Sequence, residues 1–265
     1  SQGEGYQIIV VHGIFGGFDQ TLVMASGQIG DHFYSIAPSR FGYLDSPLPE
    51  DASPESQADM FACLLNALGV DETAILGTSA GGTSAIQFAL RHPERCSALI
   101  LVSSNAPGET VGLPPKPVAN ILFRSDFVFW TLAHPFRSTM HSIMGVPEDY
   151  KMTPAQEQEM ENVIQTVLPV KPRADGALFD MYVSNPAINE DYALEDIKVP
   201  TLIIHAQDDP LASYQNARRM ANRIPTAEFV SIPDGGHPLL GHEEFIRSTI
   251  TDFLEESIES TTVER

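Results

Sequence analysis

The stretch "TAILGTSAGGTSAIQFALRHP", from Thr73 to Pro93, holds an apolar β-rich run, a tight corner and an amphipathic run in direct succession. The β-rich run ends at Gly77, and the pentapeptide that starts there, Gly-Thr-Ser-Ala-Gly, fits the pattern G-x-S-x-G. A strand before and a helix after this pattern lift the serine onto an exposed corner. We therefore expect Ser79 to be a nucleophile. The alternative is an ordinary Gly/Ser turn, because so short a pattern also occurs by chance.

Strand and helix patterns alternate on both sides of this corner. The apolar β-rich runs predict strands at 6–11, 33–38, 73–77, 97–102, 200–206 and 227–233. Amphipathic runs between and after them predict helices, among them 53–69, 213–224 and 242–258. The first of these has Ser53 as N-cap, Pro54 at its first position and Gly69 as its stop. Such alternation predicts an α/β fold with a mostly parallel, doubly wound sheet that helices cover on both faces.

Strand patterns are missing between residues 109 and 192. This stretch is rich in proline and has helical runs at 117–136 and 153–168, the second of which starts with a capping box formed by Thr153 and Gln156. We expect an inserted helical cap at 109–192. The core of the fold would then be formed by residues 1–108 and 193–265.

Composition excludes some functions and leaves others open. The 265 residues carry a formal net charge of −20, which argues against binding to nucleic acid or anionic lipid. No stretch approaches the roughly 20 apolar residues of a membrane span. The two cysteines, Cys63 and Cys96, give neither a disulfide framework nor a metal-binding spacing, and we expect both to be buried. The start of the chain has no signal-peptide layout, so we expect a cytoplasmic protein unless a targeting segment has been trimmed.

A serine nucleophile needs a base, and the chain offers eight histidines. His237 follows two glycines directly after the last predicted strand, so it should lie at the carboxyl edge of the sheet, as Ser79 does. Its rival is His242, five residues further on. His12 and His205 are expected to be structural, and no context supports His32, His92, His134 or His141.

The orienting acid should come from "PTLIIHAQDDPLAS", in which two aspartates, Asp208 and Asp209, follow a buried strand. One carboxylate is enough to hold an imidazole in the required tautomer and to stabilise its cation. The residues alone leave both aspartates open.

Four segments together resemble the successive signatures of the α/β-hydrolase superfamily: "VVHGIFGG", "LGTSAGG", "HAQDDPLAS" and "DGGHPLLGHEEFIRSTITDFL". The resemblance covers nearly the whole chain, with a variable cap at 109–192. It implies His237 as the base, Asp209 as the acid, and Asp208 as a solvated or capping neighbour. It also implies backbone N–H donors for an oxyanion at Ile14 and Ala80, with Phe15 as a possible substitute for Ile14. The usual sheet of the superfamily has two further strands before the run at 6–11; a shorter sheet and a missing upstream segment both stay open.

The function implied is a serine hydrolase that cleaves a small to medium, largely apolar carboxylic ester with water, through an acyl-enzyme and without metal or organic cofactor. A lactonase, a thioesterase and a carbon–carbon bond hydrolase use nearly the same triad. The alternative of another class is a ligand receptor of this fold that does not turn over. A haloalkane dehalogenase is disfavoured, because it resembles this layout with an aspartate where this chain has Ser79.

The apolar residues of the cap should divide between holding it on the core and lining an acyl pocket. Our candidates for substrate contact are Phe15, Phe127, Trp130 and Met140. Arg124, Arg137 and Arg173 could bind a carboxylate or phosphate, although exposed salt bridges are the simpler interpretation. The sequence makes no prediction of the oligomeric state.

Overall fold

Six parallel strands form one sheet in the computed structural model, which describes residues 3, 5–29, 33–108 and 112–263. The strands are β1 (Tyr6–Val11), β2 (Phe33–Ile36), β3 (Thr73–Thr78), β4 (Cys96–Val102), β5 (Thr201–Ala206) and β6 (Ala227–Ile232). Their order is β2-β1-β3-β4-β5-β6, so the winding direction reverses beside β1. The predicted doubly wound α/β fold is therefore confirmed. His32 and the predicted start of the cap at 109–111 lie outside the described residues.

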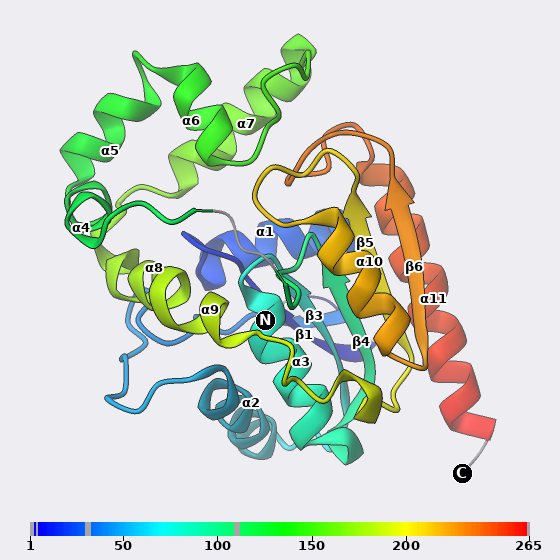
Figure 1. Cartoon of the computed structure of the whole chain (residues 1–265). Coiled ribbons are helices and arrows are strands. Elements are labelled where there is room, and N and C mark those ends of the chain that lie inside the picture. Colours follow the sequence, from blue (N-terminus) through cyan, green and yellow to red (C-terminus); the bar gives the residue numbers. More distant parts are fainter. Residues whose placement is uncertain (1–2, 4, 30–32, 109–111, 264–265) are drawn as a thin grey trace.

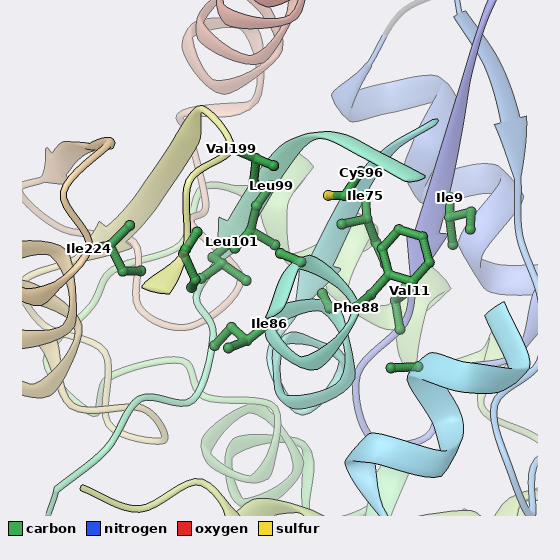
Figure 2. Close-up of a cluster of buried hydrophobic side chains, with 14 of the residues drawn as sticks. Ile9, Val11, Ile75, Ile86, Phe88, Cys96, Leu99, Leu101, Val199 and Ile224 are labelled. Carbon is green, nitrogen blue, oxygen red and sulfur yellow. The ribbon is translucent and has the colours of Figure 1, made fainter. Parts of the chain in front are cut away.

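Helices cover both faces of the sheet because alternate strand residues point to opposite faces. Ile9 and Val11 of β1 belong to one apolar cluster, which packs under α2 (Pro54–Leu68), α3 (Gly81–Arg91) and α10 (Tyr214–Arg223) (Figure 2). Ile8 and Val10 belong to a second cluster, under α1 (Phe18–Gln28) and α11 (Glu243–Val263). Apolar residues on both faces of the strands thus hold the sheet as a rigid platform for the loops at its carboxyl edge.

Local sequence signals set the helix ends as expected. Ser53 and Ser56 form a capping box at the start of α2, and Gly69 ends that helix in the left-handed conformation with φ of 68°. The buried stripe of α2 repeats at helical spacing through Ala58, Phe61 and Leu65, and Cys63 lies off that stripe. Cys63 is consequently exposed, so the expectation that both cysteines are buried was wrong for it, whereas Cys96 in β4 is buried.

A long helical segment connects β4 to β5. Its described residues, 112–200, contain α4 (Lys116–Phe123), α5 (Asp126–Ala133), α6 (Arg137–Ile143), α7 (Pro154–Thr166), α8 (Ala174–Phe179), a π-helical turn (Asp180–Ser184) and α9 (Asn185–Ala187). Helices α4 to α7 form a lobe beside the sheet, and α8 and α9 lie between that lobe and the core (Figure 1). Thr153 and Gln156 form the predicted capping box at the start of α7. Below we call residues 112–200 the helical segment.

The helical segment has an apolar cluster of its own. Phe123, Phe129 and Met140 are among its buried members, and Phe15 joins them from the loop after β1. The ring of Phe15 meets those of Phe123 and Phe129 edge-on, at centroid distances of 5.0 and 5.6 Å. The loop after β1 is therefore packed directly against the helical segment. Within the described residues, no helix combines the length and the apolar character that crossing a membrane requires.

Candidate active site

Ser79 occupies the sharp corner between β3 and α3. Its φ of 53° lies in the left-handed region, which is unfavourable for a residue with a side chain. The corner is held because the Ser79 N–H donates to the carbonyl of Val102 in β4 at 3.0 Å, and the Ser79 carbonyl accepts from Gly82 at 3.1 Å. Gly81 permits the close approach of α3 to β1: a methyl group there would lie 2.5 Å from the carbonyl oxygen of Val11. Gly81 of the G-x-S-x-G pattern is therefore required for steric reasons.

A chain of hydrogen bonds joins Ser79 to the loops after β5 and β6. His237 Nε2 lies 2.8 Å from Ser79 Oγ, and His237 Nδ1 lies 2.8 Å from Asp209 Oδ2. The side chain of His237 is 14% exposed and that of Asp209 is fully buried, so the chain of bonds runs from a partly accessible imidazole to a dry carboxylate. The structure therefore brings the three residues of the predicted triad together; their catalytic roles stay a prediction.

The carboxylate of Asp209 is held from two sides. Its Oδ1 accepts the N–H groups of Leu211 and Ala212 at 2.8 and 2.9 Å, while Oδ2 faces His237 and, at 3.3 Å, Nε2 of His205. Burial by itself raises the pKa of Asp209, but the charge interaction with His237 and the hydrogen bonds from both imidazoles outweigh it. The resulting pKa lies well below the ordinary aspartate value, so Asp209 is a carboxylate at neutral pH.

The rival residues have other partners. Asp208 Oδ1 accepts the N–H of Gly236 at 2.9 Å, so the neighbouring aspartate anchors the backbone of the His237 loop and does not contact the imidazole. His242 bonds to the exposed Asp234 at 2.9 Å. His205 is fully buried and also lies 2.9 Å from the carbonyl oxygen of Ala212, as expected of a structural histidine.

The loop after β1 lies against Ser79. A Cβ at Gly13 would lie only 2.9 Å from Ser79 Cβ and 3.4 Å from Ser79 Oγ, so Gly13, which precedes Ile14, lies against the serine side chain. Among the described residues, neither the Ile14 N–H nor the Ala80 N–H has a hydrogen-bond acceptor. Two such N–H groups beside a nucleophile could bind negative charge that develops on a substrate oxygen. Their role as oxyanion donors remains a prediction.

The four predicted substrate contacts lie in different environments. Phe15 and Met140 are buried in the cluster of the helical segment, at 6% and 0% exposure. Phe127 is 74% exposed, and Trp130 is 48% exposed and stacks on the ring of His134 at 4.5 Å. Of these four residues, Phe15 directly follows Ile14 in the sequence.

Each of the three arginines considered as anion ligands has a carboxylate partner. Arg124 and Asp175 form an exposed pair at 2.6 Å, and the exposed Arg137 lies 3.7 Å from Glu161. Arg173 pairs with Asp19 at 2.6 Å, but its own side chain is only 2% exposed. The expectation of exposed salt bridges was therefore wrong for Arg173, because its guanidinium lies under the loop after β1, where it also donates to the carbonyl of Gly16 at 2.7 Å.

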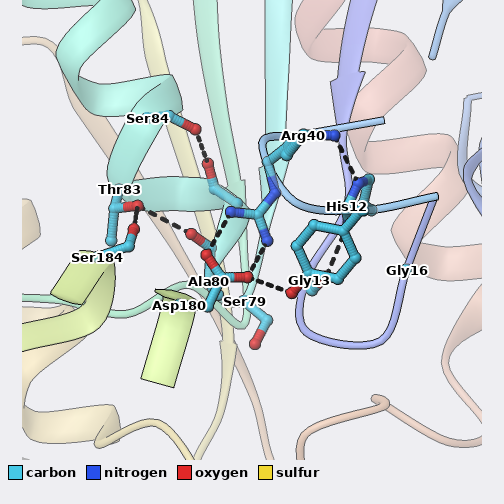
Figure 3. A network of polar contacts seen from close by, with 12 residues as sticks. His12, Gly13, Gly16, Arg40, Ser79, Ala80, Thr83, Ser84, Asp180 and Ser184 are labelled. Atoms are coloured by element: carbon cyan, nitrogen blue, oxygen red, sulfur yellow. Dashed lines mark hydrogen bonds and ion pairs between the residues drawn. The ribbon is translucent and has the colours of Figure 1, made fainter. Parts of the chain in front are cut away.

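Two contacts of this site had no signal in the sequence. The N–H of His237 donates to the carbonyl of Gly145 in the helical segment at 2.9 Å. In addition, Arg40 and Asp180, which are far apart in the chain, form a buried ion pair, and Ser184 of the same turn as Asp180 bonds to Thr83 of α3 at 2.7 Å (Figure 3). Neither partner belongs to a local pattern that short-range spacing could reveal.

A sequence profile that describes the alpha/beta hydrolase fold matches residues 6–243. The chain belongs to the α/β-hydrolase family. Among solved structures similar to this α/β-hydrolase is an alpha/beta hydrolase fold protein from Nakamurella multipartita, with a TM-score of 0.75 and 24% identity over 95% of this chain and 93% of that one. At this identity the likeness concerns the fold.

Curated relatives of this α/β-hydrolase are hydrolases of more than one kind. A poly(3-hydroxyalkanoate) depolymerase of Ectopseudomonas oleovorans is 29% identical over 75% of this chain, and the match spans 66% of that relative's length. A 2-hydroxy-6-oxononadienedioate/2-hydroxy-6-oxononatrienedioate hydrolase of Paraburkholderia phymatum is 25% identical over 81% of this chain and 73% of its own. The relatives support an enzyme of the hydrolase class.

Proposed function

We propose that this α/β-hydrolase is a serine hydrolase that cleaves a small to medium carboxylic ester through an acyl-enzyme. The observation that carries the proposal is the continuous chain from Ser79 Oγ through both ring nitrogens of His237 to Asp209 Oδ2, with 2.8 Å at each bond. A serine hydroxyl is a weak nucleophile until a base within hydrogen-bond reach removes its proton. This chain supplies such a base and an ionised carboxylate that orients it.

The hydrogen-bond partners of His237 determine which of its ring nitrogens carries the proton. Because Asp209 is ionised and can only accept, the proton of neutral His237 lies on Nδ1, and Nε2 accepts from the hydroxyl of Ser79. In the first step Ser79 Oγ bonds to the ester carbonyl carbon and its proton passes to Nε2. The N–H groups of Ile14 and Ala80 bind the resulting oxyanion.

Collapse of this tetrahedral intermediate breaks the bond to the alcohol, which leaves with the proton from His237 Nε2. Water then attacks the acyl group on Ser79 Oγ, with His237 again as base and then as acid. The products are the carboxylic acid and the free enzyme. The negative charge of Asp209 stabilises the imidazolium in both halves of the reaction.

The surroundings favour an apolar acyl group. The helical segment, whose residues up to 192 we propose act as the cap, presents an apolar cluster that continues into the loop of Ile14 and Phe15. Its three arginines, at 124, 137 and 173, each already face a carboxylate of this chain. This pairing favours an uncharged ester over the dioate substrates that the name of the Paraburkholderia relative indicates.

The test is hydrolysis of p-nitrophenyl esters from acetate to decanoate by the wild type, Ser79→Ala and His237→Ala. His242→Ala is the matched control, because His242 follows the same loop but bonds to Asp234. We expect repeated turnover by the wild type and by the control, and a loss on the order of 10⁶ in kcat for Ser79→Ala. The acyl chain length that is hydrolysed fastest indicates the length of the acyl pocket.

Two results would contradict the proposal. One is a wild type that is inert on every ester, and the other is equal activity of Ser79→Ala. A single slow turnover, together with a large rise in melting temperature on addition of the ester, would instead indicate a receptor. Parallel assays with a lactone and a thioester of the preferred acyl length distinguish an esterase from the other hydrolases that use this machinery.

A further inference from the structure

Asp180 is a buried carboxylate of the helical segment, in the turn whose Ser184 bonds to Thr83 of α3 (Figure 3). Its side chain has no exposed area, and the side chain of its partner Arg40 is only 3% exposed. Both terminal nitrogens of Arg40 bond to the two carboxylate oxygens, the first at 2.7 Å, and the hydroxyl of Tyr43 donates to Oδ2. Two-point pairing of this kind fixes the orientation of both planar groups.

From Arg40 the contacts continue to the loop after β1. The backbone N–H of Arg40 lies 3.1 Å from His12 Nε2, and since a backbone N–H can only donate, Nε2 must be the acceptor. Burial and the charge of Arg40 lower the pKa of His12 well below its ordinary value, so the ring is neutral and its single proton is on Nδ1. That proton is donated to the carbonyl oxygen of Gly13 at 2.8 Å.

The direction of the Gly13 carbonyl sets the direction of the Ile14 N–H. The peptide between them is trans, so its C=O and N–H groups point to opposite sides. His12 Nδ1 holds the oxygen on one side, and the N–H of Gly16 also donates to it at 3.3 Å. The Ile14 N–H is thereby turned away from these donors, within a loop that packs on Ser79.

We propose that Asp180 is a positioning residue, which acts through Arg40 and His12 to aim the Ile14 N–H at the developing oxyanion. The inference rests on the proposed function, because an oxyanion forms only if Ser79 attacks a carbonyl. It also means that the helical segment takes part in forming the transition-state site, in addition to covering it.

A purely structural role would be to anchor the helical segment, and the structure separates the two roles. The segment has other anchors on the loop of Arg40: the N–H of Gly176 donates to Gly42 at 2.9 Å, and the N–H of Leu44 donates to Pro172 at 2.8 Å. These bonds do not involve the carboxylate of Asp180. An Asp180 variant should therefore keep the segment in place while it loses the fixed orientation of Arg40.

The experiment compares Asp180→Asn with Asp175→Asn, which breaks the exposed ion pair to Arg124 in the same segment. Active sites are counted by titration with a p-nitrophenyl alkylphosphonate, and kcat and KM are measured on the preferred p-nitrophenyl ester. Binding of an alkylboronic acid, which forms a tetrahedral adduct with the serine, reports on the oxyanion site. Together these measurements distinguish a misdirected Ile14 N–H from a smaller amount of folded protein.

For Asp180→Asn we expect kcat per titrated site to fall about ten- to a hundredfold, because the loss of one oxyanion donor typically costs about 10²–10³. KM should change less than about twofold, and the boronic acid should bind more weakly by a factor similar to the loss in kcat. The Asp175→Asn control should differ from wild type by less than about twofold in all three. An unchanged kcat per titrated site for Asp180→Asn would overturn the proposal.

Because Asp180→Asn leaves a buried guanidinium without its counter-charge, it could fail to fold. The double variant Arg40→Met/Asp180→Leu removes both charges and keeps the backbone N–H of residue 40. We expect it to fold and still to show the reduced kcat; full wild-type kcat in this variant would overturn the proposal. If instead the wild type is inert or Ser79→Ala is fully active, the proposed function itself fails, and the inference fails with it.

Discussion

The replacement Asp209→Asn changes one atom of the candidate triad, and the surrounding hydrogen bonds predict its effect. Oδ1 of Asp209 accepts two backbone N–H groups, from Leu211 and Ala212. The asparagine carbonyl must keep those two donors, so its NH₂ group takes the place of Oδ2 and faces His237 Nδ1. An NH₂ group can only donate, so the proton of His237 moves to Nε2.

With its proton on Nε2, His237 donates to Ser79 Oγ and can no longer accept the hydroxyl proton. We expect kcat to fall about 10⁴-fold, the size of loss that the wrong tautomer causes in a serine protease. The stability should change less than activity does, because the acceptor for the two backbone donors is kept. The assay is steady-state hydrolysis of the preferred p-nitrophenyl ester, with urea unfolding of the same samples.

Asp208→Asn is the matched control. The neighbouring carboxylate accepts one backbone N–H, that of Gly236, and an asparagine carbonyl can accept it equally. We expect kcat within about threefold of wild type for this variant. The assignment of the acid would be refuted if the two variants lost activity alike, or if Asp209→Asn kept more than a tenth of the wild-type kcat.

Three further outcomes are expected. The pKa of Asp209 is lowered by folding, so its ionisation contributes stability above the unfolded value of about 3.9, and that contribution is lost as the pH falls toward the folded value; urea unfolding should show the stability difference between wild type and Asp209→Asn shrinking as the pH falls below about 4. Gly81→Ala would put a methyl 2.5 Å from the carbonyl that ends β1 and should cost about 1–3 kcal/mol in urea unfolding, whereas Gly27→Ala, with open space around it in α1, should be neutral or stabilising by up to about 1 kcal/mol; equal effects would contradict the steric argument. Ellman's reagent should titrate the exposed Cys63 in the native protein and reach Cys96 only after unfolding, because burial both shields that thiol and raises its pKa.

The sequence predicted the parts of the site that local patterns encode. The strand, the corner and the helix around Ser79 are contiguous, and the glycines after the last strand mark the loop of His237. The rule that parallel strands bring their carboxyl ends to one edge then places both loops near each other. The residues alone left the adjacent Asp208 and Asp209 open, and the family resemblance selected Asp209. The folded backbone adds that Asp208 meets a loop N–H and Asp209 meets the imidazole.

Contacts between distant segments had no sequence signal. Arg40 and Asp180 are 140 positions apart and join a loop of the core to a turn of the helical segment. Neither residue type is diagnostic by itself, since most arginines and aspartates are solvated. The same holds for Arg173, whose burial depends on the loop after β1 passing over it. Such pairs are set by how the helical segment packs on the core, which periodicity does not report.

The hydrogen bond from the His237 N–H to the Gly145 carbonyl has a consequence for protein engineering. Gly145 has a φ of 85°, and a Cβ at this position would lie 2.3 Å from His237 Cβ, so the turn at Gly145 fits closely against His237. A helical segment transplanted from another family member would replace this turn along with the proposed substrate contacts. Unless the graft brings a glycine and a carbonyl to the same place, His237 in the chimera would be misplaced. Pocket redesign in this chain should therefore keep residues 144–146 and vary the helices on either side.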